Sequence, residues 1–205
     1  MRVLCSLVLA GTLVALSVPA IAQDDQPVVS AEELAKMDEI FASYASAGPE
    51  HKHLDPLVGT YEYTSSFWPM AGMDPMIDSG TAEYSWEYEG RFLRQSASGT
   101  SMGMPFAGTG IMGFDRYRGE HFLIWYDNMT TSVMMIRGAA DETGKAITYE
   151  GTHDNVWEDK KDVWVKSILT IGDDAHTLSM YVKDPDGKEF KNFEIQYTRA
   201  KMAAK

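Results

Sequence analysis

The sequence predicts an all-β protein: an antiparallel up-and-down barrel of about ten strands, preceded by one N-terminal amphipathic helix. From Val58 onward, apolar and polar residues alternate with a period of two, which is typical of strands with one buried face. Turn-forming residues interrupt this alternation at intervals of about ten residues. Before Val58 the apolar residues recur with the helical period instead, so a helix precedes the strands.

The first 22 residues have the pattern of a cleavable signal peptide. Arg2 is followed by the apolar run 3–18 and then by Pro19-Ala20-Ile21-Ala22, a small-x-small cleavage site before Gln23. We therefore expect a periplasmic or secreted protein with no membrane attachment after cleavage. Cys5, the one cysteine, leaves with the signal peptide, so the mature chain has no disulfide and no cysteine metal ligand.

Length and charge restrict the organisation and the partners. We expect a signal peptide at 1–22, a leader and helix at 23–50, and a single β-barrel domain at 51–200. The formal net charge of −12 makes nucleic acid and anionic membranes poor partners. The oligomeric state stays open.

The expected helix begins at a capping box, because Glu33 follows Ser30 by three positions. It ends before Gly48 and Pro49. Its apolar residues form one stripe, which needs a surface to pack against: Leu34, Met37, Ile40, Phe41 and Tyr44.

Ten expected strands follow, at 58–67, 80–88, 91–98, 106–115, 120–127, 131–139, 145–153, 161–171, 176–183 and 188–199. The connections at 89–90, 141–144 and 184–187 have the composition of hairpin turns, so sequence neighbours should pair antiparallel. Closure removes the exposed strand edges of such a meander, and we favour a barrel over an open sandwich for this reason.

Four segments resemble a known family in their sequence and order: HKHLDPLVGTYEY, GRFL, GMPFAGTGIMGFDRYRGEHFLIWYDNMTT and FEIQYTR. The chain resembles the bacterial family of uncharacterised exported proteins called domain of unknown function 1579, from about His51 to Arg199. This resemblance implies a calycin-like barrel and brings no assigned activity. Many calycin-like chains have Trp early in the first strand, and Tyr61 stands here instead. The resemblance implies that Arg199 packs across Tyr61 as a structural latch, a cation–π contact of about 1 kcal/mol.

We expect the binding site in the barrel interior. Gly108 and Gly110 share one strand face and leave room there, either for a ligand or for the ring of Trp86 or Trp125. We expect a small hydrophobic or amphipathic ligand, with Arg94 or Arg137 as its polar anchor. The expected wall consists of Trp86, Met104, Phe106, Met112 and Trp125, an assignment that depends on strand register.

Three other functions stay open. The methionines Met70, Met73 and Met76 are spaced as soft ligands of a periplasmic Cu(I) site. A barrel packed solid could act through its surface alone. Asp115 and Asp127 are carboxylates at strand ends, more typical of turn capping than of catalysis. No recognisable catalytic motif or cofactor fingerprint is present, so we expect no cofactor and no enzyme.

Overall fold

The computed structural model describes residues 29–156 and 158–201. The predicted signal peptide and most of the leader lie outside these residues. The described chain begins with helix α1 (Ala31–Tyr44), as expected. Its capping box is formed: Ser30 N donates to Glu33 Oε2 over 2.8 Å, and Glu33 N donates to Ser30 Oγ over 3.2 Å. The apolar stripe of α1 is exposed, and none of the helix residues is buried.

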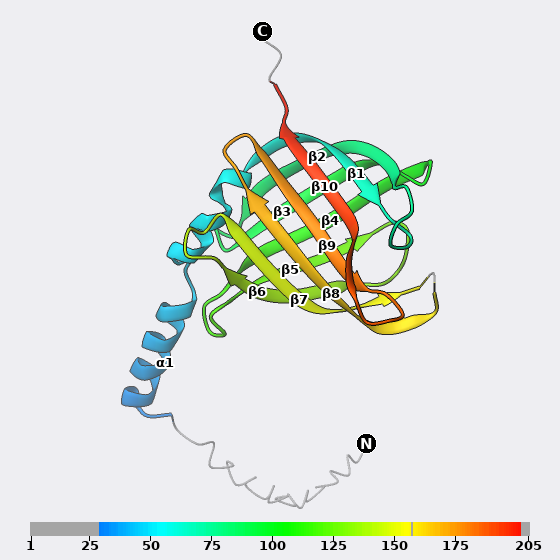
Figure 1. The fold of residues 1–205 in the computed structure, drawn as a ribbon. Coiled ribbons are helices and arrows are strands. Elements are labelled where there is room, and N and C mark those ends of the chain that lie inside the picture. The colour runs from blue at the N-terminus through cyan, green and yellow to red at the C-terminus, as the bar shows by residue number, and fades with distance from the viewer. Residues whose placement is uncertain (1–28, 157, 202–205) are drawn as a thin grey trace, which may run out of the picture. The chain divides into compact units, whose positions relative to one another are not determined.

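Ten antiparallel strands close into one barrel, with β1 paired to β10, which confirms the predicted fold class (Figure 1). Sequence neighbours pair all the way round, as a meander requires. The strands are β1 (Gly59–Phe67), β2 (Met76–Glu87), β3 (Phe92–Ser101), β4 (Met104–Asp115), β5 (Glu120–Asp127), β6 (Met134–Ala140), β7 (Ala146–Asn155), β8 (Lys160–Ile171), β9 (Ala175–Lys183) and β10 (Glu189–Arg199).

Two strand connections differ from expectation. The sequence suggests a loop between β3 and β4, but both strands continue to a tight turn at Met102 and Gly103. Both turn residues have positive φ, 51° and 75°. Hairpin turns of this kind normally contain Asn-Gly. Because Met102 stands in place of the asparagine, the sequence does not predict a turn here. Strand β2 also begins earlier than expected, at Met76, because its first residues pair with the end of β1.

A 3-10 helix, η1 (Pro49–Leu57), precedes β1, in a segment between the expected helix and the first expected strand. Leu54 and Leu57 are fully buried and His51 is 5% exposed. In an up-and-down barrel, alternate connections lie at the same end. We call the end with η1 and the β2–β3, β4–β5, β6–β7 and β8–β9 connections the closed end, and the opposite one the open end.

Aromatic rings pack densely inside the barrel near the closed end. The His176 ring stacks on Tyr197 with centroids 4.2 Å apart and contacts Tyr61 edge-on at 4.6 Å. Its Nε2 lies 3.0 Å from the Tyr84 hydroxyl. A second buried imidazole, His121, lies with its Nε2 3.3 Å from His53 Nδ1 of η1. These side chains form a solid end to the barrel.

Arg199, the last residue of β10, joins three elements at the closed end. Its guanidinium carbon lies 4.8 Å from the Tyr61 ring centroid, and Tyr61 is its register partner on β1. Its two terminal nitrogens donate to the carbonyls of Val58, over 2.9 Å, and Pro56, over 2.8 Å. The Tyr61 hydroxyl also donates to the Pro56 carbonyl, over 3.0 Å. One side chain therefore ties η1 to the β1–β10 seam.

Replacing Arg199 should destabilise the barrel. We expect Arg199→Met to lower the free energy of unfolding by about 2–3 kcal/mol, because it removes two carbonyl hydrogen bonds and the cation–π contact. Gly59→Ala should act similarly, since a Cβ there would lie 2.4 Å from Arg199 Nη1 at a backbone φ of 134°. Urea unfolding measures both. The control, Arg118→Met on an exposed turn, should stay within about 0.5 kcal/mol; an equal effect there would contradict the latch.

The buried imidazoles should make the fold sensitive to acid. Burial lowers the pKa of His121 to about 4 and that of His176 to about 3, from 6.5. Below pH 6.5 the unfolded chain then binds more protons than the folded chain, so the free energy of unfolding decreases as pH falls toward 4. The slope from each imidazole approaches about 1.4 kcal/mol per pH unit below pH 6.5, where the unfolded imidazole is fully protonated and the folded one is still neutral.

Urea unfolding between about pH 7 and pH 5 measures this slope, in a range above most carboxylate titration. His176→Phe keeps an aromatic ring against Tyr197 and removes one titrating group. Averaged from pH 7 to pH 5, its slope should be lower than that of the unmodified protein by about 1 kcal/mol per pH unit, because the unfolded imidazole is only partly protonated near pH 6.5. Identical slopes would show that His176 does not titrate on unfolding as its burial requires.

Candidate functional site

The barrel is hollow between the aromatic end and the open end. A cavity of about 980 Å³ occupies this part of the interior. Its deepest lining residues are Tyr84, Gln95 and Tyr197, which are all buried. It extends to the connections of the open end, and no residue of η1 lines it. Access from outside is therefore through the open end. A barrel packed solid, one of the alternatives from the sequence, is contradicted by this volume.

Most of the cavity wall is apolar. Inward-facing positions of the strands alternate with outward-facing ones, and the inward set supplies aromatic rings, thioethers and branched chains. Such a wall suits a hydrophobic ligand body. The main apolar contributors are Phe67, Phe106, Met112, Leu123, Trp125, Met134, Val163, Leu169, Leu178, Met180, Phe193 and Ile195.

Trp125 of β5 lies flat against β4 because two glycines leave space for its ring. A Cβ on Gly108 would lie 2.4 Å from Trp125 Cζ2, and one on Gly110 would lie 3.3 Å from Cε3. Phe106 stacks on the same indole, with centroids 6.3 Å apart and planes 14° apart. The glycines thus keep Trp125 close to the wall and leave the cavity open.

Polar groups also face this apolar interior, at both its deep end and its open end. Gln95 Nε2 donates to the Tyr197 hydroxyl over 2.9 Å at the deep end. Burial raises the pKa of Tyr197 to about 12, so the phenol stays protonated. Nearer the open end, the Asp127 carboxylate accepts from Trp125 Nε1 and from Met129 N, each over 2.9 Å. These two interactions set the orientation of both Asp127 and Trp125.

The structure brings some of the sequence-predicted wall residues to the cavity. Phe106, Met112 and Trp125 line it. Met104 does not, although it belongs to the same strand as Phe106. Trp86 lies toward the closed end, where its Nε1 donates to Asp55 Oδ1 of η1 over 3.0 Å.

The two predicted polar anchors lie outside the cavity. Arg94 follows the inward-facing Leu93 in β3, so its side chain lies on the outer face, with Nη1 3.6 Å from Glu87 Oε1. Arg137 is next to the buried Ile136 in β6 and also faces outward. A strand shows side chains to alternate faces, and the register decides which face is inside. Neither arginine can contact a ligand in the cavity.

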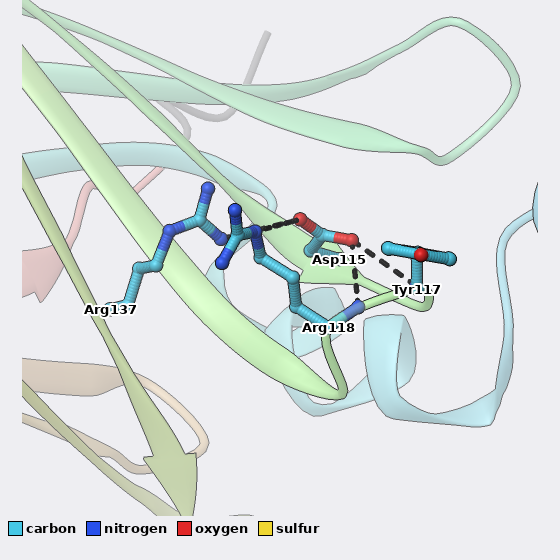
Figure 2. A network of polar contacts seen from close by, with 4 residues as sticks. All are labelled: Asp115, Tyr117, Arg118 and Arg137. Carbon is cyan, nitrogen blue, oxygen red and sulfur yellow. Dashed lines mark hydrogen bonds and ion pairs between the residues drawn. The ribbon is translucent and has the colours of Figure 1, made fainter.

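Arg137 instead belongs to a polar network around Asp115 on the outside of the barrel (Figure 2). Asp115 Oδ2 lies 3.3 Å from Arg137 Nη1 and 3.6 Å from Arg118 Nε. Asp115 Oδ1 accepts from the backbone N–H groups of Tyr117 and Arg118. Asp115 thus caps the β4–β5 turn at the closed end, whereas Asp127 lies at the other end of the same hairpin.

Several site residues could not be assigned from the sequence. His153 is the one histidine among the described lining residues, and burial lowers its pKa. Gln95 and Asp127 follow the alternation of their strands, which is the only signal that could have revealed them. In the described part of the chain, no three side chains of histidine, cysteine, aspartate or glutamate are grouped to hold a metal ion.

The predicted Cu(I) ligands lie at the open end. Met70 and Met76 line the cavity there, and Met70, Met73 and Met76 are all exposed. Met73 does not line the cavity. Thioethers in such a position also act as flexible apolar contacts at a pocket mouth.

The fold and the cavity define a class of protein: hollow antiparallel β-barrels with an apolar interior open at one end. Within it, this chain belongs to the family described as "Protein of unknown function (DUF1579)", which matches residues 46–199 and confirms the resemblance drawn from the sequence. The chain is also similar to the crystal structure of Rv2717c from M. tuberculosis, with a TM-score of 0.58 and 15% identity. That match covers 76% of this chain and 100% of the other, and it concerns the fold alone.

A comparison with curated proteins finds no match to this chain. Among residues 29–156 and 158–201, no helix is long and apolar enough to cross a membrane.

Filling the space beneath Trp125 should destabilise the barrel. We expect Gly108→Ala to lower the free energy of unfolding by about 1–3 kcal/mol, because the new methyl group must displace the indole from its position on β4. Urea unfolding measures the change. Ala107→Val, on the exposed outer face of the same strand, should stay within about 0.5 kcal/mol. Equal losses in both variants would show that the inward space at Gly108 is not required.

Proposed function

We propose that this protein is an exported binding protein that holds one small hydrophobic or amphipathic molecule inside its barrel. The observation that carries the proposal is the cavity of about 980 Å³ with its aromatic and aliphatic wall. Pockets for small molecules occupy about 300–1,000 Å³, so this cavity is large enough for a ligand of that kind. The burial of its apolar surface supplies the driving force for binding.

Export is supported by the pattern of residues 1–22, which has the n-region, apolar run and cleavage site of a signal peptide. A hydrophobic molecule outside the cytoplasm has low solubility in water. A barrel with an apolar interior and a strongly acidic chain, net charge −12, provides a carrier that is itself well hydrated.

The Cu(I) alternative has weaker support. Met70 and Met76 line the open end of an apolar cavity, where flexible side chains can adapt to a ligand that enters. This role accounts for the methionines without a metal, so we favour the carrier.

A neutral environment-sensitive dye tests the proposal directly. We expect N-phenylnaphthylamine to bind with increased fluorescence, because the cavity removes it from water. Leu178→Trp places a larger ring in the cavity and should weaken dye binding about tenfold or more. Ile124→Trp places the same ring on the outer face of β5 and should leave binding unchanged. Absence of dye binding, or equal effects of the two variants, would reject a ligand in the barrel.

A further inference from the structure

The charged side chains around the cavity are unbalanced. Of the lining residues that the structure describes, five carry carboxylates and two carry ammonium groups. The carboxylates are those of Asp78, Asp127, Asp154, Glu158 and Asp184, and the ammonium groups are those of Lys160 and Lys183. All of them lie toward the open end, which a ligand must pass. The entrance is therefore electronegative.

Both lysines have partners other than a ligand. Lys160 Nζ lies 2.9 Å from Glu158 Oε2, so these two charges offset each other. Lys183 Nζ lies 4.6 Å from the ring centroid of Trp164, a residue that does not line the cavity. Within residues 29–156 and 158–201, none of the four aspartates at the cavity has a lysine or arginine nitrogen within 4.0 Å of a carboxylate oxygen. The two lysines are therefore outnumbered by the carboxylates, and Lys160 is already paired with one of them.

Asp127 is the carboxylate set into the wall itself. Its two oxygens each accept one hydrogen bond from the protein, and a carboxylate oxygen can accept more than one. The indole of Trp125 lies directly beside it, and Phe106 stacks on that indole. A carboxylate next to aromatic faces is a favourable environment for an amine, through a charge-assisted hydrogen bond and cation–π attraction.

Two buried groups in the wall lack a hydrogen-bond partner: the Asn192 oxygen requires a donor, whereas the Tyr149 hydroxyl can donate or accept. Asn192 Oδ1 is buried, lines the cavity and has no hydrogen-bond partner. The Tyr149 hydroxyl, on a fully buried residue that also lines the cavity, has none either. Buried polar groups in proteins normally have a hydrogen-bond partner. Unpartnered groups beside a cavity therefore indicate a ligand that forms hydrogen bonds with them.

We propose that the cavity selects cationic amphiphiles, hydrophobic amines whose ammonium group binds Asp127 beside Trp125, over fatty acids and other anions. The proposal rests on the function proposed above and adds the chemical class of the ligand. At Asp127, a fatty carboxylate would lose water and meet a like charge, which is costly in an apolar interior. The ammonium group of an amine can form an ion pair with the Asp127 carboxylate, and the electronegative opening attracts it.

Three ligands with the same alkyl chain test the selectivity: dodecylammonium, dodecanol and dodecanoate. Each competes with N-phenylnaphthylamine for the protein produced from the complete gene. We expect dodecylammonium to bind at least about tenfold more tightly than dodecanoate, with dodecanol between them. Asp127→Asn should weaken dodecylammonium about tenfold and leave dodecanol unchanged. Asp173→Asn removes an exposed carboxylate that does not line the cavity and should change neither.

Ionic strength supplies a second measurement on the unmodified protein. Added salt should weaken dodecylammonium binding and not dodecanol binding, because only the former depends on charge. Dodecanoate binding as tight as dodecylammonium, or an Asp127→Asn effect equal to that of Asp173→Asn, would overturn the amine selectivity while dye binding still supports a carrier. Failure of the dye to bind would reject the carrier and the selectivity together.

Discussion

The structure depends on the closure of one sheet through the pairing of β1 with β10. A barrel has no free edge only when its first and last strands meet, and here the meeting point is reinforced by Arg199. The guanidinium covers the Tyr61 ring and binds the carbonyls of Pro56 and Val58, so the same side chain holds η1 across the closed end. Because Arg199 comes from the last strand, while η1 and Tyr61 come from the start of the barrel sequence, the closure of the sheet and the position of η1 across the closed end are coupled. The hollow interior exists because the seam and the plug together hold the wall in place.

The two halves of the interior have different physical roles. Near η1, rings of tyrosine and histidine pack edge to face and exclude water, and burial keeps His176 neutral. Toward the open end the same inward-facing positions carry side chains that do not meet in the middle, which leaves the cavity. Gly108 and Gly110 contribute to this difference, since they let Trp125 lie against the wall. The densely packed rings thus lie at one end of the barrel and the open volume at the other.

The chemistry of the cavity follows from which polar groups the alternation of the strands turns inward. Asp127 faces the interior, whereas Arg94 and Arg137 face outward and pair with Glu87 and Asp115. Among the described lining residues, carboxylates outnumber ammonium groups, which is the basis of the proposed preference for amines over fatty acids. The described site is therefore an apolar volume with carboxylates near its opening.

The sequence by itself determined the ten-stranded barrel, the capped helix α1 and the positions of most strands, because alternation, turn residues and the Ser30–Glu33 box are local signals. It also indicated Phe106, Met112 and Trp125, which follow the inward face of their strands. Only the tertiary structure decided that Trp86 contacts η1, that both arginines face outward and that Asp127 and Gln95 line the cavity. A shift of one residue in strand register exchanges the two faces, and the depth of a residue in the barrel depends on how all strands close around η1. Both are non-local properties, so no periodicity within a single strand reveals them.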